Sequence, residues 1–240
     1  EPLMASDGSY TCIAISEHKK NWSKLALIKN KNGREKRFSF RIKGLCIPLA
    51  FSKDNQSPVV LALSNASGKY RPALYDFKNR CASEITSVHF RGDVFVLAWN
   101  EERSDLLVCD MHKCNHRLFL YNLQTKKVVR VGPTEGSFDL FFGSAVLRAD
   151  QSFLVKWHNF NTPPRLLQLQ APKYKSWKNA FILSTRVQTK HRFKNVRFRS
   201  SDGAWIQMWV ARPQKTRIRL PFIIDIHGGP HGARCDEYSP

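Results

Sequence analysis

The sequence of 240 residues lacks any long apolar run. No segment approaches the ~18 apolar residues of a membrane-spanning helix, and the best candidate, Leu220–Ile226, is short and contains Asp225. There is no signal-peptide pattern at the start of the chain. Cysteine is also sparse, with six residues spread over a chain too large to need disulfide staples. These absences predict a cytoplasmic protein with reduced thiols and no membrane partner.

Acidic residues are scarce as well, since 19 Asp and Glu face 39 Lys and Arg, for a net charge of +20. The surplus is densest over residues 173–219, where 13 basic residues face only Asp202. Such a surplus attracts polyanions by counterion release. However, basic and apolar residues largely alternate in Arg192–Arg199, as in an amphipathic strand. Since the sequence has no recognised nucleic-acid-binding motif, we expect no specific nucleic-acid partner.

Four soft metal ligands, Cys109, His112, Cys114 and His116, fall within eight residues. Their spacing matches no zinc-finger pattern, and Cys109 ends a strand-like apolar run in which a buried thiol is ordinary. A polar hairpin loop is therefore favoured over a zinc site. We predict no metal site and no cofactor.

A repeat is visible before residue 175. Segments that begin at Leu49, Leu97 and Ala145 share a short apolar run, a polar turn and a second apolar run, at intervals of 48 residues. Each segment is followed by a third strand-like run, namely Ala73–Phe77, Leu118–Leu123 and Arg165–Leu169. A weaker copy of the pattern begins at Leu3, and its corresponding run is Leu25–Ile28. Repeated sheets with this period are typical of a β-propeller. The equal intervals favour it over a β-sandwich with coincidental spacing.

We therefore expect a mainly β protein, with a partial β-propeller of three to four blades over residues 1–172. Each blade buries its faces only against its neighbours, so a set this small should not close by itself. Further blades are expected on the N-terminal side.

The pattern changes after Pro172. Residues 173–194 are expected to form a polar connector, with a short helical turn around Trp177–Leu183. A hairpin should follow, because Asp-Gly in Ser200–Gly203 separates two alternating strands. Leu220–Ile226 then reads as a buried strand, and it leads into a glycine-rich loop. Together, residues 195–240 are expected to contain the first strands of an α/β-hydrolase domain.

The loop after this strand reads His-Gly-Gly-Pro-His-Gly, from His227 to Gly232. In α/β-hydrolases, backbone N–H groups at this position come within hydrogen-bond distance of a developing oxyanion. Glycine allows that approach because it has no Cβ and tolerates positive φ. The candidate site is therefore an oxyanion loop supported by His227, Gly228 and Gly229.

These residues carry a resemblance to a known family. The segments that carry it are Phe198–Ile206 with Trp209 and Pro213, His227–Gly232, and Tyr238–Pro240. They resemble the junction of propeller and catalytic domain in the prolyl oligopeptidase family of serine peptidases, and are most similar to its acylaminoacyl-peptidase branch. The resemblance implies a Ser-Asp-His triad that hydrolyses short peptides through an acyl-enzyme, with Gly228 and Gly229 as contributors to the oxyanion site.

The nucleophile elbow Gly-x-Ser-x-Gly that the family requires is absent. Only two pairs of glycines are four residues apart, and their central residues are Thr134 and Pro230. His227 and His231 are better read as structural residues than as bases, because no motif places a serine or cysteine beside them. We expect no catalytic residue on this chain, which the resemblance indicates is a fragment that is inactive alone.

Two other interpretations stay open. The chain could be a truncated or split relic of such an enzyme, or a non-enzymatic, propeller-like binding module with a basic surface that attracts anions. In each case unpaired blade edges would favour self-association. We expect the isolated chain to be poorly soluble or oligomeric.

Overall fold

The computed structural model describes residues 2–17, 21–30, 37–53, 58–171, 174–182, 191–213, 220–226, 228 and 233–238. The regular elements in these ranges are all β-strands, and no helix that could cross a membrane is present in them. The chain divides into two compact units. The first comprises Glu1–Met111, Leu118–Arg130 and Leu140–Ser144, and the second comprises His112–Arg117, Val131–Asp139 and Ala145–Pro240.

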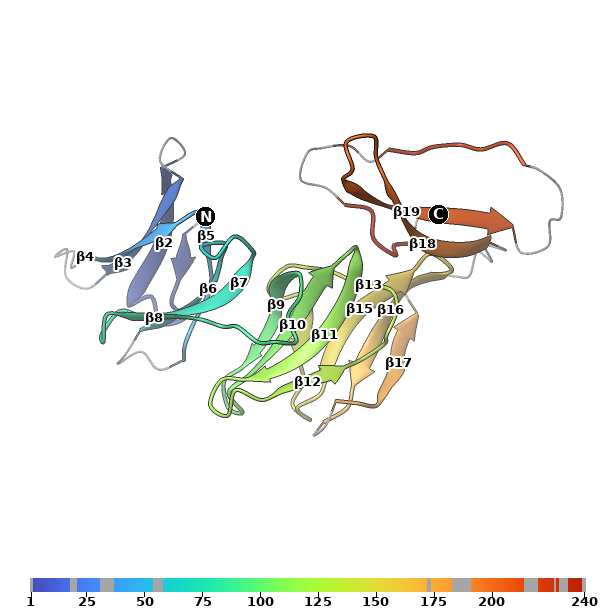
Figure 1. Cartoon of the computed structure of the whole chain (residues 1–240). Coiled ribbons are helices and arrows are strands. Elements are labelled where there is room, and N and C mark those ends of the chain that lie inside the picture. Colours follow the sequence, from blue (N-terminus) through green and yellow to red (C-terminus); the bar gives the residue numbers. More distant parts are fainter. Residues whose placement is uncertain are drawn as a thin grey trace. The chain divides into compact units, whose positions relative to one another are not determined.

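The strands form four successive sheets and a final hairpin (Figure 1). Their bounds are β1 (Leu3–Met4), β2 (Tyr10–Glu17), β3 (Trp22–Lys29), β4 (Arg37–Lys43), β5 (Cys46–Phe51), β6 (Val59–Ser64), β7 (Arg71–Asp76), β8 (Cys81–Glu84), β9 (Asp93–Asn100), β10 (Asp105–His112), β11 (Asn115–Asn122), β12 (Val128–Val131), β13 (Ser137–Phe138), β14 (Ala145–Leu147), β15 (Phe153–Asn159), β16 (Thr162–Leu169), β17 (Trp177–Ile182), β18 (His191–Arg199) and β19 (Trp205–Pro213).

Each of the first three sheets has four strands in sequence order, β1–β4, β5–β8 and β9–β12. The fourth has the order β13-β15-β16-β17, with β14 also paired to β15. Consecutive strands therefore neighbour one another, as in the blades of a propeller. The predicted repeat is confirmed, because Leu49 lies in β5, Leu97 in β9 and Ala145 at the start of β14.

Apolar packing joins the first and second sheets. Cys12, Leu25 and Leu27 from the first sheet share one buried cluster with Cys46 and Val60 from the second. Burial raises the pKa of the Cys12 thiol to about 12 and that of Cys46 to about 11. Both side chains are free thiols in the structure, and they pack as small apolar groups.

A second cluster buries the opposite face of the second sheet. Leu61 of β6 packs there with Val94 and Val96 of β9 and with Leu106 of β10. Since side chains alternate across a strand, Val60 and Leu61 point to different clusters, and both have no exposed surface. The second sheet is thus covered on both faces, as an internal blade requires.

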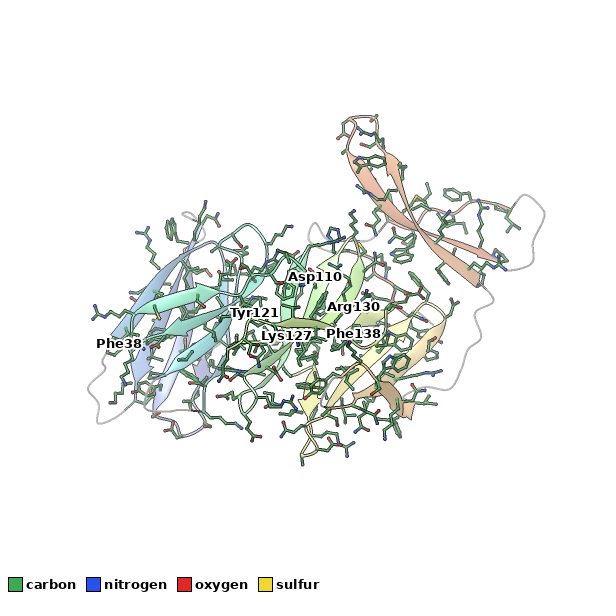
Figure 2. The ribbon with its side chains drawn as sticks, turned by 60° about the horizontal axis from the view of Figure 1, so that its bottom comes forward. Phe38, Asp110, Tyr121, Lys127, Arg130 and Phe138 are labelled. Atoms are coloured by element: carbon green, nitrogen blue, oxygen red, sulfur yellow. The ribbon has the colours of Figure 1, made fainter. Side chains whose placement is uncertain are left out.

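Two aspartate carboxylates hold loop backbone in place. Asp110 of β10, labelled in Figure 2, is fully buried, and its Oδ1 accepts hydrogen bonds from the backbone N–H of Arg91 (3.0 Å) and Gly92 (2.7 Å). Asp93 accepts in the same way from the N–H of Tyr70, at 2.8 Å. These acceptors satisfy loop N–H groups that no strand partner reaches.

The segment with four soft ligands is a hairpin, as predicted. It spans the end of β10 and the start of β11, and Lys113 and Cys114 between them both have positive φ, of 53° and 54°. Two consecutive residues of this kind are the pattern of a type I′ turn. Cys109 is fully buried.

The predicted helical turn around Trp177–Leu183 is wrong. Trp177–Ile182 forms β17, which pairs with β16 in the register Leu169↔Trp177. The free edge of β16 offers backbone groups to this segment, and tertiary pairing outweighs a weak local helical preference. The fourth sheet therefore extends past the boundary that was predicted at residue 172.

The final hairpin is confirmed, with Arg199 opposite Trp205 across the predicted turn. The buried strand predicted at Leu220–Ile226 is not observed. This segment is irregular, and Phe222, Ile223 and Ile226 are 70%, 88% and 83% exposed. A strand that is apolar on both faces needs covering layers on both sides, and the part of the chain that the structure describes provides none.

This exposure predicts self-association. We expect the 240-residue chain to elute as an oligomer in size-exclusion chromatography with light scattering, because a contiguous apolar segment favours burial against another copy. Phe222→Lys combined with Ile223→Glu should shift the population toward monomer. Val88→Lys is the control, since Val88 is an isolated exposed side chain (92%). A monodisperse wild-type monomer would contradict this expectation.

Candidate functional site

The predicted oxyanion loop is only partly described. His227 and Gly229 lie outside the described residues, whereas Gly228 is described and exposed. A Cβ built on Gly228 would meet no atom within 4 Å. Crowding by the described residues therefore does not require glycine at this position, and the predicted role of these three residues stays a prediction.

The structure instead places the segment that follows this loop, residues 233–238, against the fourth sheet. The Asp236 carboxylate accepts two backbone hydrogen bonds, from the N–H of Gly136 to Oδ2 (3.0 Å) and from the N–H of Phe160 to Oδ1 (2.9 Å). The backbone N–H of Tyr238 donates to Nδ1 of His158 at 2.9 Å, and the Cys235 side chain is buried. All of these residues belong to the second unit.

Local structure explains why these two N–H groups are available. Phe160 lies in the tight connection between β15 and β16, and Gly136 directly precedes β13. Gly136 has a φ of +91°, and the Nε1 of the neighbouring Trp157 donates to the backbone O of Glu135 at 2.7 Å. A Cβ on Gly136 would lie 2.6 Å from the backbone O of His158. Glycine is therefore required here by both backbone conformation and space.

The β18–β19 hairpin meets the same connection. The Phe193 ring stacks on Phe160 with centroids 4.1 Å apart, and Trp209 packs edge-on against Phe160 at 5.1 Å. The Trp209 Nε1 also donates to the backbone O of Arg234 at 3.0 Å. Trp209 is thus a packing residue, and it links the hairpin to the segment with Asp236.

A buried histidine lies in the same unit. His116 Nδ1 accepts from the backbone N–H of Phe138 at 3.0 Å, while its Nε2 and the Ser137 hydroxyl have no hydrogen-bond partner among the described residues. Burial, and then the nearby His158, lower the pKa of His116 to about 4. The imidazole is therefore neutral at physiological pH.

Burial also shifts the groups that hold the segment 233–238. It raises the pKa of Asp236, although the hydrogen bonds from Phe160 and Gly136 act in the opposite direction. Burial lowers the pKa of His158, opposed by the carboxylates of Glu237 and Asp139. Asp236 and His158 accept hydrogen bonds from backbone N–H groups. The arrangement fixes one chain segment to another.

No group of three or more potential metal ligands is present in the ranges that the structure describes. Of the soft ligands at 109–116, Cys109 lies in β10 and His116 in β11, and both side chains are buried. In the structure, Cys109 and His116 contribute to the packing of β10 and β11.

Comparison with solved structures identifies the fold. Prolyl oligopeptidase B from Galerina marginata, bound to a 25mer macrocyclization substrate, matches 90% of this chain with a TM-score of 0.67 and 15% identity. The apo form of that enzyme matches with a TM-score of 0.63 and 14% identity. A puromycin-hydrolyzing peptidase of Mycobacterium tuberculosis matches 87% of the chain with a TM-score of 0.62 and 10% identity.

The chain has the fold of the propeller region of these peptidases. It spans about a third of their length, 31% of the Galerina enzyme and 33% of the mycobacterial one. No family model and no curated protein matches the sequence. At these identities the similarity establishes the architecture, and the activity of the complete protein is a separate inference.

Sequence reasoning missed Asp236, His158 and Gly136 as interacting residues. Asp236 lies 100 residues from Gly136 and 76 from Phe160 in the chain, and no local motif connects positions so far apart. The only available signal was an acidic residue in a basic chain, close behind the glycine-rich loop. That signal did not indicate a partner.

We predict that Gly136→Ala destabilises the second unit by roughly 3 kcal/mol or more, because it combines left-handed backbone strain with a clash against the His158 carbonyl. Gly203→Ala is the matched control in the same unit, since Gly203 has a similar φ of +82° and a Cβ there would meet only the Arg199 guanidinium, at 3.9 Å. It should cost about 1–2 kcal/mol from backbone strain alone. Urea unfolding of both variants measures the difference, and equal effects would show that the contact at Gly136 is soft.

Burial of His116 predicts acid sensitivity. Its folded pKa of about 4 lies below the ordinary value of 6.5, so the unfolded state binds the proton more readily. The stability that this neutral histidine contributes is complete above about pH 6.5 and is lost as the pH falls toward 4, by on the order of 3 kcal/mol.

His116→Asn retains an acceptor for the Phe138 N–H and cannot titrate. Urea unfolding at pH 7.5 and pH 4.5 should show a smaller loss of stability on acidification for this variant than for the wild type. Exposed His89 provides the control through His89→Asn. If the two substitutions change the pH dependence equally, burial of His116 is not the cause.

Proposed function

We propose that this chain is a segment of a serine peptidase of the prolyl oligopeptidase family, closest to the acylaminoacyl-peptidase branch. One observation carries the proposal: the propeller-type sheets are followed by a hairpin and by the motif His227–Gly232. That order matches the junction the family requires, and the chain shares its fold with peptidases of this type over 90% of its length. Residues 195–240 would begin the α/β-hydrolase domain.

In the complete protein, a serine in a Gly-x-Ser-x-Gly elbow attacks the peptide carbonyl while a histidine, oriented by an aspartate, takes its proton. The backbone N–H groups near Gly228 and Gly229 support the oxyanion that forms in that step. Water then hydrolyses the acyl-enzyme. The present chain contributes the oxyanion loop, and we propose that it is inactive by itself.

The propeller sheets would control access to the site. The proposed substrates are short peptides, because blades stacked around a channel admit only chains that fit through it or between the domains. The reduced thiols fit a cytoplasmic location. No metal or cofactor is needed for acyl transfer of this kind.

Two exposed elements support a larger parent structure. Strand β17 is exposed along its length, with Phe181 at 60% and Ile182 at 56%, and Leu220–Ile226 is apolar and exposed. A further blade from the N-terminal side, next to the fourth sheet in a closed propeller, would cover the first, and neighbouring hydrolase strands would cover the second. In the isolated chain both surfaces are available for self-association.

One observation favours the alternative of a non-enzymatic, anion-attracting module. At the tip of the hairpin, Trp205 is 55% exposed, and the guanidinium groups of Arg197 and Arg199 each lie 4.8 Å from its ring centroid. Arginine beside an exposed aromatic ring can stack on and attract single-stranded nucleic acid. Binding that is driven only by charge would weaken steeply with salt.

An active-site probe tests the peptidase proposal. We expect a fluorophosphonate to label a serine in a longer product of the gene and to leave the 240-residue chain unlabelled, because the chain has no nucleophile elbow. The longer product should also cleave short peptides, and it should lose both labelling and cleavage when the elbow serine is replaced by alanine.

Two results would contradict the proposal. Labelling of the 240-residue chain would show that a nucleophile is already present. A gene that encodes no elbow downstream would exclude the peptidase function and leave the relic and the binding module. Nucleic-acid binding that persists at moderate salt would then favour the binding module over the relic.

A further inference from the structure

The segment 233–238 follows directly after the motif His227–Gly232, and its main polar anchor is Asp236. The carboxylate is more than half buried, and each of its two oxygens accepts one backbone N–H. Burying a carboxylate is costly unless such donors compensate it. Hydrogen bonds to an ionised acceptor are stronger than neutral ones. The arrangement is therefore specific for a group with two acceptor oxygens.

The two donors come from different parts of the fourth sheet. Gly136 lies just before β13, and Phe160 lies between β15 and β16. One carboxylate thus ties the segment to two loops at once. A third hydrogen bond runs from the backbone N–H of Tyr238 to His158 Nδ1. A fourth runs from the Trp209 indole N–H to the backbone carbonyl of Arg234. The ties lie on both sides of Asp236 in the chain.

From this geometry we infer that Asp236 is a positioning residue that anchors the chain immediately behind the His227–Gly232 motif to the fourth sheet. The chain that follows the motif is thus held by Gly136 and Phe160, which lie in loops of the fourth sheet. The consequence for catalysis rests on the function proposed above: the last blade would set the position of the oxyanion loop.

Asp225 provides a contrast. It lies before the motif and pairs with Arg234 at 3.7 Å, but its side chain is 78% exposed and that of Arg234 is 59% exposed. Exposed ion pairs of this kind stabilise little. The two carboxylates on either side of the motif therefore differ in burial and in the partners they hold, which makes one a control for the other.

The test is Asp236→Asn in the 240-residue chain. Asparagine has the same shape but replaces one acceptor oxygen by an NH₂ group, so either Gly136 or Phe160 would face a donor. Hydrogen exchange of these two amides, and tryptic cleavage after Arg234, should each become roughly tenfold faster or more. Asp225→Asn removes the same charge and should leave the exchange rates of the Gly136 and Phe160 amides near the wild-type values.

Exchange of the β15 and β16 amides, which belong to the same unit as Asp236, reports whether the rest of that unit is intact. If Asp236→Asn unfolds these strands as well, Trp209→Phe provides a second, milder variant that weakens the attachment of the same segment. It removes the indole donor to Arg234 and keeps an aromatic ring against Phe160, and it should accelerate cleavage after Arg234 alone.

Unchanged exchange and cleavage in Asp236→Asn would overturn the inference, as would an equal effect of Asp225→Asn. These readouts do not depend on peptidase activity. A failure of the active-site probe would leave the anchor standing, and a failure of the anchor would leave the peptidase proposal standing.

Discussion

Burial of each sheet face against a neighbouring sheet is the constraint on which this fold depends. A single four-stranded sheet with two apolar faces is not stable in water, and in β6 the adjacent residues Val60 and Leu61 enter different cores. The second sheet therefore holds the first and third in place. Loop acceptors such as Asp110 then fix the connections between sheets at positions that strand pairing does not reach.

Much of this arrangement could be predicted from the sequence, because it is periodic. The 48-residue interval from Leu49 to Leu97 and then to Ala145 located three sheets, and Asp202-Gly203 located the final hairpin. The misassigned element, Trp177–Ile182, has no turn signal of its own and becomes a strand through pairing with β16. When a segment becomes a strand mainly through pairing with another strand, its local sequence alone does not predict that strand.

The candidate site shows the same division. The motif His227–Gly232 can be recognised locally, because its glycines and histidines stand together in the chain. The contacts of Asp236 could not be predicted, because they join positions 100 and 76 residues apart and each donor is a backbone N–H, which any residue except proline carries. The accepting residue can be recognised in the sequence by its carboxylate, whereas the donating residues have no side-chain feature that identifies them.

The order of the strands also bears on how the chain folds during synthesis. In the first three sheets neighbouring strands are consecutive in sequence, and in the fourth only β13 pairs past its successor, to β15. Each sheet can therefore close its contacts soon after it leaves the ribosome. The link from Gly136 to Asp236 must wait for 100 further residues. The apolar segment Leu220–Ile226 leaves the ribosome before that link can form, and it stays exposed in the structure. It is therefore a target for chaperones during and after synthesis.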